Sequence, residues 1–265
     1  SSPNIILIIG DDMGVETLAS YGLAKNPPKT AALNELARRG VRFNNFWSQP
    51  VCSPTRATLM TGRYGFRTGI GRPVGRSKMP TPPAKPVRSP PESTDHTYPT
   101  VASRGDRALP KPFLLPEEFT LPMALKTDPD LGYSTAAIGK WHLAGDGNGW
   151  IDHPNLAGFD HFAGLMGGGP ESYFAWNKVV NGEVTGKIGY TPTDKVADAS
   201  RWLDKQDENP WFLWFAFNLG HTPLHFPPKE HLQSDYSEFD SSKMEREVYQ
   251  ASFAAMIEAM DMQID

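Results

Sequence analysis

The chain alternates between short apolar stretches and segments with helical periodicity. Residues 4–10 (NIILIIG) and 211–218 (WFLWFAFN) show almost no polar alternation, which is typical of strands buried on both faces. Residues 41–47 and 134–138 are shorter segments that also predict strands. Strands of this kind occur mainly in parallel sheets, because antiparallel strands usually alternate apolar and polar residues.

Segments with helical periodicity lie between these strands. In residues 31–39, Leu33, Leu36 and Ala37 share one helical face, and Gly40 supplies a stop signal. The other predicted helices are 55–61, 121–127, 194–206 and 241–265. This alternation predicts an α/β fold, with a mostly parallel sheet sandwiched by helices.

The last predicted helix reaches Asp265 without a glycine, a proline or a cationic final turn. We therefore expect residues 1–265 to be the N-terminal portion of a larger catalytic α/β domain, incomplete at its C-terminal side. The chain begins Ser-Ser-Pro-Asn without Met, as after removal of a signal peptide or after a cut at that point. We expect an exported protein, periplasmic or extracellular.

Residues 72–116 differ from the rest of the chain. They hold 11 of its 25 prolines, and eight Lys or Arg against three Asp or Glu. Proline lacks the amide hydrogen that regular ladders require. This basic segment is therefore predicted to be a long loop or lid, either bordering the site entrance or lying as a solvated surface loop.

Composition excludes several classes of protein. The 265 residues include one cysteine, which rules out an intramolecular disulfide framework, and the net charge of −4 argues against a nucleic-acid binder. No apolar run approaches the ~20 residues that span a bilayer. We expect no nucleic-acid partner and no membrane span.

Polar residues gather where three of the predicted strands end. Asp11 and Asp12 follow the first, Lys140 and His142 follow the strand at 134–138, and His221 follows the last. Ligands of open α/β sheets bind beyond the carboxyl ends of the strands, so one shared site is expected. Adjacent carboxylates favour a hard cation such as Ca²⁺ or Mg²⁺, although the pair would equally suit a solvated turn.

Cys52 precedes a predicted helix start at Pro54. Helix N-termini attract anions, and Arg56 lies about one turn further on the same face, so the two could combine a reactive thiol with an anion clamp. A buried, inert cysteine is the alternative. Gly167–Gly169 could cradle an anion, but a lone glycine triplet is weak evidence, and a flexible loop is the favoured interpretation.

His221 and His225 have the i, i+4 spacing of a zinc site on a helix. Three prolines, at 223, 227 and 228, disfavour a helix there and therefore the zinc site.

At these residues the chain resembles the type I, formylglycine-dependent sulfatases of the alkaline-phosphatase-like superfamily. Cys52-Ser53-Pro54-Thr55-Arg56 fits the Cys-x-Pro-x-Arg signature of that family. The matching stretches occur in family order: PNIILIIGDDMG (3–14), LARRGVRFNNFWSQPVCSPTRATLMTGRY (36–64), GYSTAAIGKWHL (132–143), GFDHFAG (158–164) and PWFLWFAFNLGHTPLHFP (210–227).

The resemblance implies specific roles. A maturation enzyme would oxidise Cys52 to Cα-formylglycine, whose hydrate attacks a small-molecule or carbohydrate sulfate ester. Arg56 and Lys140 would stabilise the hydrate and the ester anion, and His142 would act as its base. His221 would contact the sulfate or protonate the leaving alcohol.

The resemblance also implies a divalent cation, most often Ca²⁺, bound by Asp11, Asp12 and an oxygen of residue 52. The family supplies further metal ligands and a second lysine from a C-terminal half, and the sequence offers no candidates for them. Two alternatives therefore stay open: a phosphate or phosphonate monoester hydrolase of the same superfamily, and a catalytically incomplete anion-binding fragment.

Overall fold

A computed structural model describes residues 2–75, 78–79, 113–243 and 245–265. The predicted lid at 72–116 lies mostly outside these residues. The described helices and strands, in chain order, are β1 (Ile5–Ile9), α1 (Ala31–Arg39), α2 (Cys52–Thr61), α3 (Gly65–Thr68), α4 (Leu121–Leu125), β2 (Ser134–Lys140), α5 (His153–Leu156), β3 (His161–Leu165), β4 (Ala175–Val180), β5 (Glu183–Ile188), α6 (Thr191–Leu203), β6 (Trp211–Ala216) and α7 (Arg246–Ile264).

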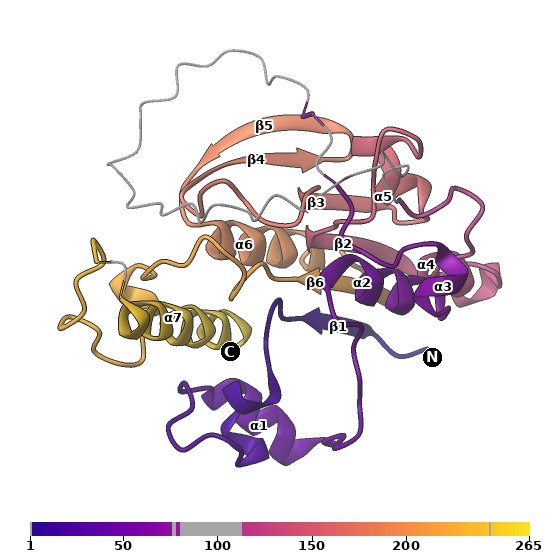
Figure 1. Cartoon of the computed structure of the whole chain (residues 1–265). Coiled ribbons are helices and arrows are strands. Elements are labelled where there is room, and N and C mark those ends of the chain that lie inside the picture. The colour runs from indigo at the N-terminus through magenta and orange to yellow at the C-terminus, as the bar shows by residue number, and fades with distance from the viewer. Residues whose placement is uncertain (1, 76–77, 80–112, 244) are drawn as a thin grey trace.

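The six described strands form one mixed sheet in the order β1-β6-β2-β3-β4-β5 (Figure 1). The first four strands in that order are parallel to one another, with Ile5 opposite Phe212 and Ser134 opposite Trp211. β4 and β5 join as an antiparallel hairpin. The α/β fold with a sheet of parallel strands flanked by helices is confirmed.

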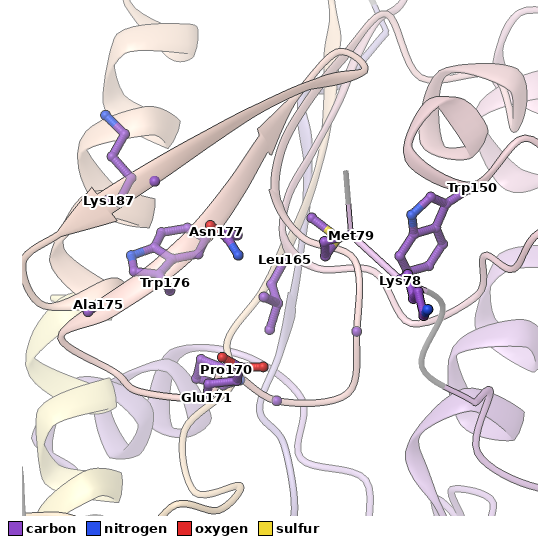
Figure 2. Close-up of a pocket in the computed structure, with 13 residues that line it drawn as sticks. Lys78, Met79, Trp150, Leu165, Pro170, Glu171, Ala175, Trp176, Asn177 and Lys187 are labelled. Atoms are coloured by element: carbon purple, nitrogen blue, oxygen red, sulfur yellow. The ribbon is translucent and has the colours of Figure 1, made fainter. Parts of the chain in front are cut away.

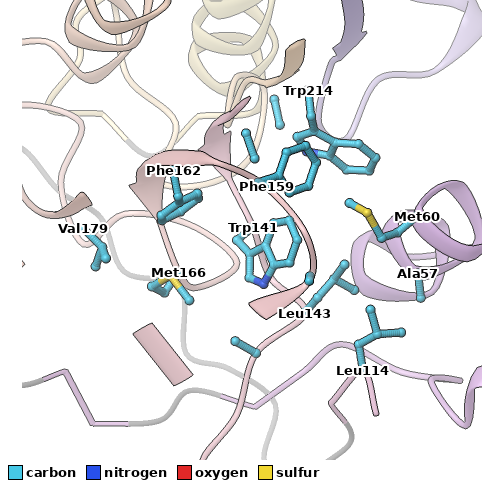
Figure 3. Packing of buried hydrophobic residues seen from close by; sticks show 14 of the residues in the cluster. Ala57, Met60, Leu114, Trp141, Leu143, Phe159, Phe162, Met166, Val179 and Trp214 are labelled. Carbon is cyan, nitrogen blue, oxygen red and sulfur yellow. The ribbon is translucent and has the colours of Figure 1, made fainter. Parts of the chain in front are cut away.

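Side-chain alternation along the central strands builds two apolar cores. On β6, Phe212 and Trp214 enter the core beneath α2 and α4, whereas Leu213 and Phe215 enter the core beneath α6 and α7. Figure 3 shows the first of these cores around Trp141. Because both faces of β6 are covered, its sequence WFLWFA is apolar at every position.

Two expectations about the N-terminal part are wrong. β1 is not buried on both faces, because it lies at one end of the described sheet and Ile6 is 48% exposed. Residues 41–47 form no strand, and Val41, Phe43 and Trp47 are all exposed. Strand formation needs a neighbouring strand, and none of the described strands pairs with this segment. The helix predicted at 31–39 is present as α1, whose apolar face is only partly covered, with Leu36 exposed.

The other predicted elements occur within a few residues of their expected bounds. The largest difference is α7, which begins at Arg246 rather than at residue 241. None of the described helices is long and apolar enough to cross a membrane.

Candidate active site

The carboxyl ends of β1, β2 and β6 meet at one edge of the sheet. β6 lies between the other two, and Asp11 bonds across this edge: its amide donates to the carbonyl of Leu219 at 3.0 Å. The residues that follow these strands are brought into one cluster, as the sequence predicts.

Asp11 is the central anion of the cluster. Its side chain is 4% exposed, and one carboxylate oxygen is paired with the Lys140 ammonium. The other oxygen lies 3.7 Å from Nη2 of Arg56. Arg56 also donates from Nη1 to the backbone carbonyl of Lys140 at 2.8 Å. Two buried cations, one from α2 and one from the end of β2, therefore share one carboxylate.

Burial opposes the charge on both cations. It lowers the pKa of Lys140, and nearby Arg56 lowers that pKa further, while Asp11 raises it. Burial likewise lowers the pKa of Arg56, against the attraction of Asp11. Nε of Arg56 is buried and has no hydrogen-bond partner among the described residues. The cluster is therefore richer in positive charge and in donors than Asp11 alone can balance, which suits a bound anion.

Cys52 is the first residue of α2, and its Sγ lies 3.2 Å from Nδ1 of His142. The other ring nitrogen of His142, Nε2, lies 2.9 Å from the carbonyl oxygen of Val74. A carbonyl can only accept, so Nε2 carries the proton of the neutral ring and Nδ1 presents a lone pair to Sγ. Burial, with Lys140 second, lowers the pKa of His142 to about 3, which keeps the ring neutral.

The backbone around this histidine is tightly held. Ser53 Oγ donates to the carbonyl of His142 at 2.9 Å and accepts from the amide of Val74 at 3.0 Å. His142 itself has a φ of 59°, in the left-handed region that side chains other than glycine rarely adopt. Ser53 and Val74 are site contacts that the sequence reasoning missed, because no motif links residue 74 to residue 142.

Asp12 and His221 lie at the rim. The side chain of Asp12 is 55% exposed, and its Oδ2 is 4.0 Å from Nε2 of His221. Asp12 has a φ of 51°, also left-handed. His221 Nδ1 lies 2.8 Å from the carbonyl of Thr222. The structure thus brings His221 to the acidic pair.

A glycine loop adjoins both histidines. A Cβ on Gly168 would lie 2.8 Å from the ring of His142, and one on Gly169 would lie 2.7 Å from Nδ1 of His221. Only glycine permits this close approach. The prediction of a flexible loop for this segment therefore missed its position between two site histidines. The glycine triplet itself is the sequence signal for this close approach.

Beside this loop lies a cavity of about 440 Å³ (Figure 2). Its walls are mainly apolar, and polar groups stand at its margin. The residues that line it include Met79, Trp150, Leu165, Gly169, Glu171, Trp176 and Lys187. Trp150 and Trp176 lie on opposite sides of the cavity in Figure 2. Its size and character are those of a site for a small organic molecule.

The described residues contain no group of three or more His, Cys, Asp or Glu side chains placed to hold a metal ion. The carboxylates of Asp11 and Asp12 are the oxygen donors that Ca²⁺ and Mg²⁺ prefer. One of them is already paired with Lys140 and Arg56. The donor chemistry fits a hard cation, but the ligand set is incomplete within the described part of the chain.

His225 packs among aromatic side chains. Its ring lies 4.4 Å from the ring of Tyr173 and 5.6 Å from that of Tyr190, and its Nε2 is 3.2 Å from the Tyr190 hydroxyl. Burial lowers the pKa of His225 to about 4. Residues 221–228 form no helix, so the i, i+4 spacing does not place the two histidines on one helical face.

The carboxyl edge of this α/β sheet thus carries a buried cationic cluster and a cysteine–histidine contact, an arrangement suited to binding an anion. The comparisons with known proteins give the family. The model of the sulfatase family matches residues 3–265, so the chain belongs to that family.

Curated relatives agree with this assignment, and a solved structure shares the fold. Mouse arylsulfatase J is 28% identical over 252 residues, which cover 88% of this chain and 35% of the relative. Mouse steryl-sulfatase is 36% identical over 167 residues, covering 62% of this chain and 22% of the relative. The crystal structure of Ps i-CgsB matches with a TM-score of 0.71 and 24% identity, over 100% of this chain and 53% of that one. The chain therefore spans about a third or less of these curated relatives and about half of the solved structure.

Proposed function

We propose that the protein of which this chain is part hydrolyses sulfate esters, with an aldehyde made from Cys52 as the precursor of its nucleophile. The observation that carries the proposal is the 3.2 Å approach of Cys52 Sγ to the proton-free Nδ1 of His142. This contact lies where Lys140 and Arg56 surround Asp11. A nucleophile, a base and cationic groups for an oxyanion are the parts that such a reaction needs.

Each residue has a role that follows from its position. A hydrated aldehyde at residue 52 would supply one hydroxyl for in-line attack on sulfur and a second whose deprotonation expels sulfate. His142 Nδ1 is placed to take that proton, because Nε2 is held by the Val74 carbonyl. Arg56 and Lys140 stabilise the negative charge on the sulfate oxygens from a buried position, where one such donor contributes ~10²–10³ in rate.

The alcohol half of the ester would leave toward the rim. His221 stands there beside Asp12, and we propose that it contacts the sulfate or gives a proton to the alcohol oxygen. The cavity beyond the glycine loop would receive the alcohol, which we expect to be a small molecule or a carbohydrate. Ps i-CgsB, which shares this fold, has been solved in complex with a neocarrahexaose.

We extend the proposal to a divalent cation, Ca²⁺ before Mg²⁺, with Asp11, Asp12 and an oxygen of residue 52 among its ligands. Such a cation would add positive charge for the sulfate. Water or protein oxygens beyond the described residues would have to complete its shell. Maturation of Cys52 by a formylglycine-generating enzyme and export from the cytoplasm belong to the same proposal.

Two measurements test the nucleophile. Trypsin releases residues 43–56, and conversion of Cys52 to the aldehyde lowers the mass of that peptide by about 18 Da. We expect this shift in protein from a host with the maturation enzyme, and no shift in Cys52→Ala. We also expect Cys52→Ala to lose at least ~10³ in the turnover of an aryl sulfate while its circular dichroism is unchanged. Appreciable turnover by this variant would contradict the assignment.

One observation supports each of the alternatives. The cationic cluster would hold a phosphate ester as well as a sulfate ester, so matched aryl phosphate and aryl sulfate should be compared. A preference for phosphate would replace the proposed substrate. The incomplete cation site among the described residues supports an anion-binding role without turnover. An unmodified thiol from a maturation-competent host would favour that reading.

A further inference from the structure

Lys195 lies on α6, on the face of the sheet opposite α2, and its side chain is 1% exposed. Lysine is rarely buried to this extent unless a counter-ion accompanies it, because desolvating an ammonium costs several kcal/mol. Among the described residues, no carboxylate lies within 4 Å of its Nζ, although Lys178 on the neighbouring β4 pairs with both Asp194 and Asp198. Among the described residues, Lys195 therefore lacks a carboxylate partner of the kind that Lys178 has.

The ammonium of Lys195 points at the active-site edge of the sheet. It donates to Oδ1 of Asn218, which follows β6 and is 1% exposed. It also lies 5.9 Å from the ring centre of Trp176, which lines the cavity of Figure 2. Lys195 thus reaches the candidate site from α6, on one face of the sheet, while Arg56 reaches it from α2, on the other face.

Asn218 links Lys195 to the glycine loop. Its Nδ2 donates to the carbonyl of Gly168 at 3.4 Å. The hydroxyl of Tyr173 lies 2.6 Å from the carbonyl oxygen of Asn218 and 2.8 Å from that of His221. Asn218 is therefore hydrogen-bonded to the glycine loop directly, and to the turn at His221 through the hydroxyl of Tyr173.

We infer that Lys195 is a third buried cation of the anion site and its positioning residue, holding the glycine loop and the His221 turn through Asn218. The inference rests on the proposed function, because it assigns the negative charge that Lys195 lacks to the bound sulfate group. Among the described residues, the site without an anion has three buried cations, Arg56, Lys140 and Lys195, against the buried carboxylate of Asp11. A sulfate dianion would reduce this excess.

The charge of Lys195 depends on pH in the neutral range. Burial lowers its pKa to about 7, Asp11 and Asp194 oppose that change, and Arg56 and Lys140 add to it. Asp194 lies on α6 itself, Asp11 follows β1, Arg56 lies on α2 and Lys140 ends β2. Lys195 is therefore charged below pH 7 and neutral above it, so sulfate should bind more tightly below pH 7.

Calorimetric titration with inorganic sulfate, in EDTA at pH 6 and pH 8, tests the inference. Sulfate keeps its charge over this range, unlike phosphate. We expect the wild-type chain to bind sulfate on the order of tenfold more weakly at pH 8. Lys195→Met should bind weakly at both pH values, while Lys205→Met, which removes an exposed lysine just beyond α6, should behave as wild type.

A second variant tests the inference if Lys195→Met does not fold. Asn218→Asp gives Lys195 a carboxylate partner, so the ammonium stays charged to higher pH but is neutralised locally, and sulfate binding should be weak at both pH values. The inference is wrong if Lys195→Met, or Asn218→Asp where the former does not fold, keeps the wild-type affinity and its pH dependence. That result would leave the proposed function intact. Failure of the wild-type chain itself to bind sulfate would overturn both.

Discussion

Removing the carboxylate of Asp11 should destabilise the fold strongly, because that carboxylate neutralises two buried cations. The paired Lys140 side chain is 0% exposed and that of Arg56 is 2% exposed. At 3.7 Å and an effective dielectric constant of 20, the Arg56 pair alone represents about 4 kcal/mol of attraction before desolvation is subtracted. Breaking a buried pair by removing one partner typically costs about 3–5 kcal/mol. We expect a loss of that size for Asp11→Asn, whose side chain has nearly the same shape.

The matched variants separate charge from shape. Lys140→Met should cost less than Asp11→Asn, because Asp11 then keeps Arg56 as a partner. The double variant should be more stable than the sum of the two single losses predicts, since Lys140→Met removes one of the cations that Asp11→Asn strands. Glu35→Gln is the control: it breaks the exposed pair of Glu35 with Arg38 and should not change stability measurably.

Urea unfolding followed by tryptophan fluorescence, in EDTA at pH 7, measures these differences. A loss below about 1 kcal/mol for Asp11→Asn would refute the reasoning, because Lys140 and Arg56 would then not depend on the carboxylate. Strict additivity in the double variant would refute the coupling between Asp11 and Lys140.

Two further predictions concern the core. Burial lowers the pKa of His153 to about 4, below its unfolded value of 6.5. As the pH falls, the unfolded chain therefore binds the proton before the folded chain does. Between pH 6.5 and pH 4 this residue should lower the free energy of unfolding by about 3 kcal/mol. Unfolding curves of His153→Gln, which keeps an acceptor for Trp141, should show that much less dependence on pH over this range. Gly139→Ala should lower the free energy of unfolding by more than ~3 kcal/mol, because its Cβ would lie 1.8 Å from the carbonyl oxygen of Ala216 at a φ of 106°. Gly71→Ala, where a Cβ meets nothing within 4 Å, should leave the thermal midpoint unchanged, and equal effects of the two would contradict this account.

The elements that could be predicted are those whose local pattern and tertiary environment agree. β6 is apolar at every position because helices cover both faces of the sheet there. The pattern fails for residues 41–47, where β-branched and aromatic residues suggest a strand that no described strand pairs with. Local composition cannot reveal whether such a partner exists.

The hairpin of β4 and β5 was missed for a different reason. Its strands contain polar residues at positions that break the apolar runs, and β5 is largely exposed. The Asn181-Gly182 pair between them is a strong hairpin signal, and Asn181 does adopt a left-handed φ of 45°. Giving weight to that pair would have placed both strands.

The candidate site divides in the same way. Asp11, Lys140 and His142 follow strand ends, so the rule for open sheets was sufficient to bring them together. Lys195 comes from the middle of a helix, where a lysine usually faces solvent, and Tyr173 from a loop. Only the three-dimensional path of α6 places the lysine beneath the site, which no spacing in the sequence encodes.

The left-handed backbone at Asp12 has a consequence for engineering. The residue is mostly exposed and its Oδ2 lies 4.0 Å from Nε2 of His221, so glycine would relieve roughly 1 kcal/mol of backbone strain there with little loss of contact. A library screened for heat resistance alone would thus drift toward glycine at position 12. Such a screen would erase the exposed carboxylate of the Asp11–Asp12 pair, and any selection for robust variants should be paired with a readout of ligand binding.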